Sequence, residues 1–144
     1  MIIRSFVHPS KHVWSEDPSL DKQSANYDWA EFLRTGDLKY APAVEGGKLT
    51  VFSVKPLSRK QFTRVFSLPH GSLEQCSEAV AFGLKGIENY QVDGSPVEIK
   101  FSKVDGEERV HDEVLNRIFE PLLFIELGLR VMELSRLDPQ KGSH

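Results

Sequence analysis

The segment Leu122–Leu137 constrains the fold of this chain more than any other part of the sequence. Only Glu126, Arg130, Glu133 and Arg136 carry charge within it. Its apolar positions extend far beyond the ~100° stripe of an ordinary surface helix, and they are Leu122, Leu123, Ile125, Leu127, Leu129, Val131, Met132, Leu134 and Leu137. The segment is too short and too charged to cross the ~30 Å of a bilayer core. A helix of this kind must lie at the centre of its domain or bury a second face against another subunit.

The size of the chain favours a contribution from a second subunit. The protein has 144 residues, which fits one ordinary domain and leaves little chain to surround such a helix. We expect Leu127, Val131 and Leu134 to form an intermolecular surface opposite the core-facing Leu122, Ile125, Leu129 and Met132. Gly128 lies mid-helix, where glycine costs about 1 kcal/mol relative to alanine. Close approach of another backbone would explain it, either from a second chain or from a neighbouring helix of the same chain.

Composition excludes several classes of protein. Hydrophobic residues make up 40% and charged residues 27%, which is typical of soluble globular chains and not of disordered or collagen-like ones. The net charge of −3 and pI near 6.0 give no global positive field for nucleic acid. The single cysteine, Cys76, cannot form an intrachain disulfide, which fits a reducing compartment. Residues 1–9 lack the apolar run of a signal peptide.

Residues 1–48 differ in composition from the rest of the chain, with Pro, Gly, Ser and Asp residues around one apolar cluster, and they predict an N-terminal arm. The arm contains one short helix around Tyr27–Leu33, with Ser24 as a candidate N-cap and Gly36 as the C′ residue. The aromatic and aliphatic residues of this helix cannot share one narrow face, so Trp29 and Phe32 are candidate interface residues. The arm is either wrapped on its own domain or held by a neighbour.

Residues 49–138 predict a core domain, followed by a frayed tail over 139–144. The segment 49–55 is rich in β-branched residues and predicts a strand ending before Pro56. Ser58 and Gln61 form an S-x-x-Q capping box that starts a helix reaching Phe66. Ser72 and Gln75 repeat the signature and start a second helix, which we expect to end near Gly86.

The C-terminal half predicts a β excursion and two helices. Apolar and polar residues alternate within residues 92–109, which indicates strands, and the turn dipeptides Asp93-Gly94 and Asp105-Gly106 lie on either side. Asp112 opens one helix and Pro121 the next. The fold class is therefore α+β, a mainly helical single domain with a small β-hairpin or sheet and an extended arm. The expected core residues are Phe62, Val65, Phe66, Val80, Leu84, Leu115, Ile118, Leu122, Ile125, Leu129 and Met132.

No motif of catalysis or cofactor binding emerges from the residues. Cys76 could act as a nucleophile with His70 or His111, but it lies on the apolar face of a capped helix, where cysteine packs as a small hydrophobe. His8 and His12 have the spacing of a helical metal pair, but Pro9 removes helical geometry from His8. The sequence contains none of the common nucleotide or zinc signatures. We expect a non-enzymatic protein with no catalytic, cofactor or metal site.

Lys55, Arg59, Lys60 and Arg64 form a local basic patch. The patch could contact nucleic acid or an acidic partner. A solvated helix face is the simpler interpretation. Two of the cations lie in a first helical turn, where the helix dipole disfavours positive charge.

An ordered series of segments carries a family resemblance over residues 49–137. The series is Phe52–Ser58, Gly83–Tyr90 with Asp93–Val97, His111–Ile118, and Glu126–Gly128 leading to Met132–Leu137. It resembles small proteins of tailed bacteriophages and prophages that are encoded among virion-morphogenesis genes and described as tail assembly chaperone-like. His111 stands where the pattern has serine, Phe119–Pro121 varies the usual helix junction, and residues 138–141 replace its acidic ending.

The resemblance implies a non-enzymatic virion-morphogenesis protein that acts through surfaces. Its expected partners are other phage virion proteins, from the tail or the head–tail junction, together with a homo-oligomer, and not a membrane or nucleic acid. The expected location is the host cytoplasm during assembly. Two versions stay open: a transient assembly factor, or a minor structural subunit kept in the virion. The alternative from another class is a small effector that binds a host protein or nucleic acid through the basic patch.

Overall fold

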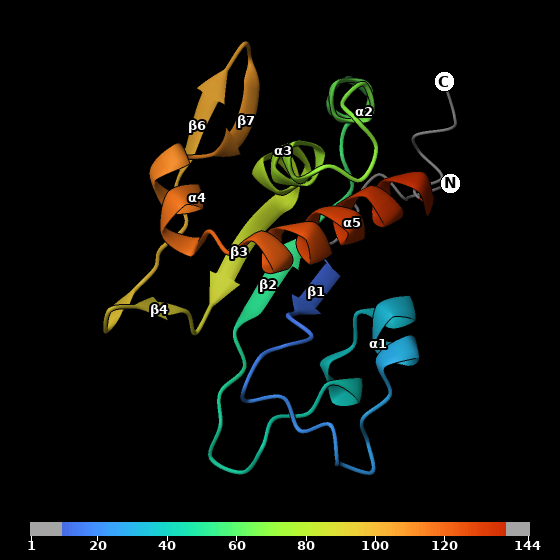
Figure 1. The fold of residues 1–144 in the computed structure, drawn as a ribbon, viewed down its shortest axis with the longest axis vertical. Helices are drawn as coiled ribbons and strands as arrows, with labels where there is room; N and C mark the ends of the chain where they lie inside the picture. The colour runs from blue at the N-terminus through green and yellow to red at the C-terminus, as the bar shows by residue number, and fades with distance from the viewer. Residues whose placement is uncertain (1–9, 138–144) are drawn as a thin grey trace, which may run out of the picture.

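A three-stranded antiparallel sheet lies at the centre of the fold, in the order β1–β2–β3 (Figure 1). The computed structural model describes residues 10–137. β1 (Ser10–Val13) pairs with β2 (Val51–Val54), and β2 pairs with β3 (Leu84–Glu88). The α+β class predicted from the sequence is confirmed.

Two helices, α3 (Leu73–Gly83) and α5 (Pro121–Leu137), form the closest helix pair of the domain. A Cβ at Gly128 would lie 2.6 Å from the Cys76 Cα, so α5 approaches the α3 backbone directly at this point. A Cβ at Gly83 would meet the Val131 side chain at 2.5 Å. The close approach expected at Gly128 therefore comes from a neighbouring helix of the same chain.

The orientation predicted for α5 is wrong. Leu127 and Val131 are fully buried and Leu134 is half-buried, so the side expected to be intermolecular faces the core. Leu122 and Leu129, expected in the core, are 64% and 44% exposed. The physical reason is Gly128, which must face α3 and so fixes the rotation of α5 about its axis. The other predicted core residues are buried or packed against the core.

The segment after α3 is a strand and not the end of a helix. The helix stops at Gly83, and Leu84 takes extended angles (φ −78°, ψ 126°) before pairing with Val54. Leu84 and Ile87 continue the helical spacing of α3, which is why periodicity predicted a helix reaching Gly86. Pairing with β2 decides the conformation instead.

The capping box of α2 (Arg59–Phe66) is confirmed. The Ser58 Oγ accepts from the Gln61 N–H, and the Gln61 side chain accepts from the Ser58 N–H at 2.9 Å. At α3, Ser72 also caps the helix, but Gln75 does not return the bond. The buried Gln75 amide instead accepts from the Gly71 N–H and donates to the Val65 carbonyl, which ties α2 to α3.

Two short hairpins replace the single β excursion expected over residues 92–109. One joins β4 (Gln91–Val92) to β5 (Ser95–Pro96), and the other joins β6 (Phe101–Val104) to β7 (Glu107–Val110). Each Asp-Gly pair has positive φ at both residues, as a type I′ turn requires, so each dipeptide forms the tip of its own hairpin. The N-cap of α4 (Asp112–Ile118) is His111 and not Asp112, because the His111 Nδ1 accepts from the Glu113 N–H.

The N-terminal arm is wrapped on its own domain over the described residues 10–48. α1 (Trp29–Thr35) and the 3₁₀ helix η1 (Leu38–Tyr40) follow β1. They build a second hydrophobic cluster on the sheet, centred on Val13, Leu20, Phe32, Ala41 and Val51. Asp28 and not Ser24 is the N-cap of α1, whereas Gly36 ends the helix at φ 70° as expected. Residues 139–144, expected to fray, lie outside the described part.

Candidate functional site

A pocket of about 310 Å³ opens between α1 and α5, beside the edge strand β1. It brings together polar and aromatic side chains from segments more than a hundred residues apart. Its lining residues are His12, Ser15, Trp29, Leu33, Glu126, Leu129, Arg130, Glu133 and Arg136. Pockets of roughly 300 Å³ and more with a few convergent polar groups are the usual binding sites for small ligands. This pocket is the candidate site.

The Glu126 carboxylate joins the arm to α5 at the base of the pocket. Its Oε2 accepts from the Ser15 N–H at 2.9 Å and lies 2.8 Å from the His12 Nε2. Its Oε1 accepts from the Ser15 hydroxyl. His12 is 1% exposed, and its ring stacks on Phe32 with a centroid distance of 5.7 Å. The arm is therefore held to α5 by a buried polar cluster as well as by its apolar contacts.

Glu126 is held in its charged form. Partial burial raises the pKa of this carboxyl, but the hydrogen bonds from His12 and Ser15 outweigh burial, and the pKa is lowered overall. Hydrogen bonds donated to a carboxylate stabilise its ionised state. A charged acceptor at this position also favours the tautomer of His12 that carries hydrogen on Nε2.

The order of these three groups is not that of a nucleophilic triad. In a triad the imidazole takes the proton of the serine hydroxyl, and the carboxylate orients the imidazole from its other side. Here Ser15 and His12 both bind Glu126, with the carboxylate between them. The His12 Nδ1 is buried without a partner among the described residues. The cluster therefore orients β1 and α5 and does not activate Ser15.

Arg130 is the most unusual residue of the pocket. Its side chain is 5% exposed, which is rare for arginine. Its Nη1 donates to the Glu133 carboxylate at 2.9 Å, one turn along the helix. Its Nε is buried and has no acceptor within the described part of the chain.

The predicted interface residues separate in the structure. Trp29 lines the pocket, while Phe32 is fully buried beneath it. Leu127 and Val131 lie in the core, and the half-buried Leu134 packs against it. The structure thus brings one of these five residues to the candidate site.

Two of the four cations of the basic patch lie close to carboxylates. Arg64 Nε lies 3.3 Å from a Glu78 oxygen, and Lys60 Nζ lies 3.9 Å from a Glu107 oxygen. Arg59 is exposed to solvent. Lys55 lies near Lys85, whose pKa is lowered by burial and by the charge of Lys55. The patch therefore presents less net positive charge than its sequence suggests.

Cys76 and the histidines do not form a reactive pair. Cys76 is fully buried against α5, and burial raises the pKa of its thiol, which disfavours the thiolate. His70 and His111 are both exposed. His8 lies outside the described residues, and within residues 10–137 no group of three or more His, Cys, Asp or Glu side chains gathers as a metal site would require.

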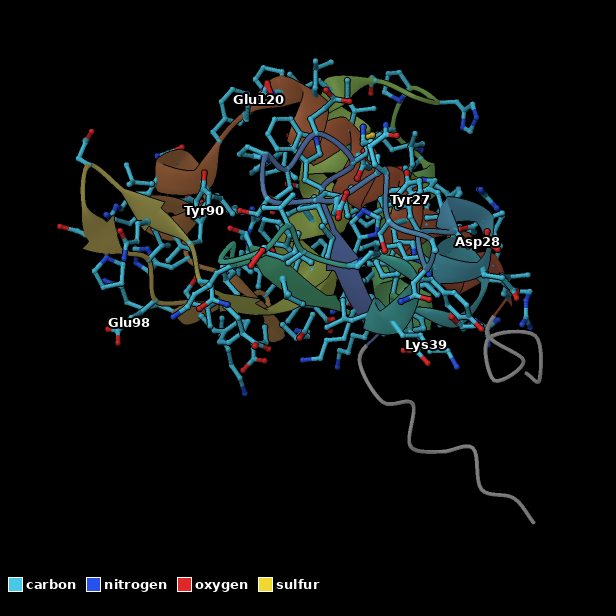
Figure 2. All side chains as sticks on the ribbon, turned by 90° about the horizontal axis from the view of Figure 1, so that it is seen from below. Tyr27, Asp28, Lys39, Tyr90, Glu98 and Glu120 are labelled. Carbon is cyan, nitrogen blue, oxygen red and sulfur yellow. The ribbon has the colours of Figure 1, made fainter. Side chains whose placement is uncertain are left out.

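Other hollows lie away from the candidate pocket. One is lined by Tyr27, Asp28 and Lys39 beside α1, and another by residues that include Tyr90 and Glu120. Figure 2 shows Tyr27, Asp28 and Lys39 at the opposite end of the molecule from Glu98. The second hollow is also lined by the half-buried Trp14, whose Nε1 is buried without an acceptor among the described residues, but neither hollow is lined by a buried charged side chain such as Arg130.

Sequence reasoning missed the principal residues of this site. His12 stood out only through its spacing from His8, and Glu126 and Arg130 only as charges that interrupt an apolar helix. The signal was those interruptions, because a charge on an otherwise apolar helix needs a partner.

In residues 10–137 no helix is long and apolar enough to cross a membrane. Comparisons with family models, curated proteins and solved structures gave no match for this chain.

Proposed function

We propose that this chain is a non-enzymatic bacteriophage virion-morphogenesis protein that acts through protein–protein contacts. The proposal combines the resemblance over residues 49–137 with the surface around α5. Its partners are other virion proteins of the tail or the head–tail junction. The observation that carries it is a row of exposed apolar side chains on α5 and just before it.

The row consists of Phe119, Leu122 and Leu129, which are 49%, 64% and 44% exposed. Leu122 and Leu129 are seven positions apart, close to two turns at about 3.6 residues per turn, so they lie on one side of the helix. Leu129 also lines the candidate pocket, so the row leads into it. Scattered exposed leucines are normal, but two exposed leucines on one side of a helix, one of them lining a pocket, are typical of a binding surface.

The experiment is a double variant, Leu122→Ser with Leu129→Ser, supplied in place of the wild-type gene during phage production. Because both side chains are exposed, each change should alter the free energy of unfolding by no more than about 0.5 kcal/mol. Circular dichroism should show a folded protein, while the yield of complete particles falls. The control is Val104→Ser, at a position that is 46% exposed on the β6–β7 hairpin away from α5 (Figure 1).

Particle yield with the double variant equal to wild type would contradict the proposal. If the particle yield falls as expected, mass spectrometry of purified wild-type particles distinguishes the two versions of the proposal, a structural subunit and a transient assembly factor. Protein present in the particles identifies a structural subunit, and protein absent from them identifies a transient assembly factor.

A further inference from the structure

Arg130 presents an incompletely paired guanidinium to the pocket between α1 and α5. Glu133 binds its Nη1, and no other acceptor within the described residues contacts the group. The buried Nε is therefore without an acceptor in this part of the chain. Buried N–H groups almost always have an acceptor, because leaving one unpaired costs free energy.

A second orphan polar atom lies on the same pocket. Among the described residues the His12 Nδ1 is buried without a partner, while its Nε2 is committed to Glu126. Both residues are more than nine-tenths buried and both line the pocket. Two segments far apart in the sequence, β1 and α5, thus each contribute to this pocket a residue with one polar atom that lacks a partner among the described residues.

We propose that this pocket binds a carboxylate group attached to an apolar body. The Nε–Nη2 edge of arginine matches the two oxygens of a carboxylate with parallel hydrogen bonds. Trp29, Leu33 and Leu129 supply apolar walls for the remainder of the ligand. The inference does not depend on a role in virion assembly.

The other charges around the pocket are compatible with an anion at this edge. Glu126 is engaged by His12 and Ser15, and Glu133 already binds Arg130. Arg136 adds a second cation to the lining and lies near the ring of Phe66. The His12 Nδ1 would donate to the same carboxylate when it carries a hydrogen; with hydrogen on Nε2 alone, Nδ1 is an acceptor and does not pair with a carboxylate.

The test uses 3-phenylpropionate as the probe and 3-phenylpropionamide as its uncharged match. Nuclear magnetic resonance of the arginine Nε–Hε groups, with Arg130 assigned by substitution, reports directly on the proposed contact. We expect the Arg130 signal to shift in a saturable way with the carboxylate and not with the amide. No shift of this signal at carboxylate concentrations on the order of 10 mM, well above a millimolar dissociation constant, would overturn the proposal.

Variants distinguish the effect of the bidentate geometry of the Arg130 guanidinium from the effect of its positive charge. Arg130→Lys keeps the cation but loses the bidentate edge, so it should weaken binding of 3-phenylpropionate about tenfold, followed through the backbone amide signals of Trp29 and Leu129. Glu133→Gln removes a competing carboxylate and should strengthen binding without disturbing the core, since Glu133 is half exposed. Arg117→Lys, exposed on α4, is the matched control and should change nothing. Equal affinity in the Arg130→Lys variant and the wild type, or weaker binding in the Glu133→Gln variant, would contradict the assignment.

A blocked tripeptide with a central glutamate, compared with its glutamine counterpart, distinguishes the source of the carboxylate. Tighter binding of the glutamate peptide than of 3-phenylpropionate identifies an acidic side chain of a protein as the ligand. The reverse order identifies a free small carboxylic acid. Both results support a carboxylate site, and failure of both probes overturns it while leaving the assembly role to its own experiment.

Discussion

Gly128 on α5 lies directly against Cys76 on α3, so close that a Cβ at residue 128 would come within 2.6 Å of the Cys76 Cα and 2.7 Å of its carbonyl oxygen. The obstacle is mostly backbone, which cannot rotate away as the end of a side chain can. This contact sets the distance between the two central helices and fixes which side of α5 faces inward.

Gly128→Ala should therefore destabilise the protein. Helix propensity alone favours alanine by about 1 kcal/mol. Forcing a methyl group into a filled interior costs about 1–3 kcal/mol. We expect a net loss of up to about 2 kcal/mol in the free energy of unfolding, the difference between these two effects, measured by urea denaturation. Leu122→Ala, on the exposed side of the same helix, is the control, and a Gly128→Ala variant more stable than wild type would show that α3 and α5 can separate freely.

Ser135 should contribute to stability through the backbone of another segment. Its hydroxyl accepts from the Leu57 N–H at 2.8 Å and donates to the Val131 carbonyl at 2.7 Å, with no exposed surface. Ser135→Ala leaves the buried Leu57 N–H without an acceptor, which costs about 1–3 kcal/mol. Thermal denaturation should show the loss, whereas Ser95→Ala, exposed on β5, should melt as the wild type does. Equal melting of the two variants would mean that another acceptor reaches Leu57.

Glu126 should make the stability of the fold depend on acid pH. Its pKa in the folded protein lies below the ordinary glutamate value of 4.5, because hydrogen bonds from His12 and Ser15 outweigh burial. The unfolded chain therefore binds its proton first as the pH falls, and stability declines with it. The stabilising effect of Glu126 is complete above about pH 4.5 and is lost as the pH falls through the lower folded pKa.

The measurement compares the free energy of unfolding of wild type and Glu126→Gln between neutral and acid pH. The difference between them should be largest at neutral pH and should shrink below about pH 4.5. Glu74→Gln, exposed on α3, controls for the loss of one surface carboxylate. A difference that stays constant with pH would show that Glu126 acts through its shape and not its charge.

Local sequence signals predicted the parts of the fold that depend on neighbouring residues. The Ser58–Gln61 capping box, the Gly36 helix end and the two Asp-Gly turns all stand as expected, because each is built from atoms a few residues apart. A local signal failed at the start of α1, where Asp28 and not Ser24 is the N-cap, and other signals failed where a distant segment decides the conformation. β3 keeps a helical apolar spacing, yet its pairing with β2 makes it a strand.

The candidate pocket illustrates the same limit. The sequence predicted Trp29 as a candidate interface residue and marked Glu126 and Arg130 as charges on an apolar helix. It could not indicate that His12 reaches Glu126 across 114 positions, because no local pattern encodes that distance. The partner of a buried charge is chosen by how the elements pack.

By itself, the sequence determined an α+β fold, the starts of α2, α3 and α5, the two Asp-Gly turns, and a central C-terminal helix with more apolar surface than one face can bury. Only the tertiary structure decided which side of that helix is inside. Apolar residues surround α5 almost completely, so periodicity alone could not choose between Leu127 and Leu129. The contact of Gly128 with Cys76 fixes the rotation of α5 about its axis. Close packing of the two backbones is possible in one rotation of the helix, whereas burial of apolar side chains would be satisfied in several.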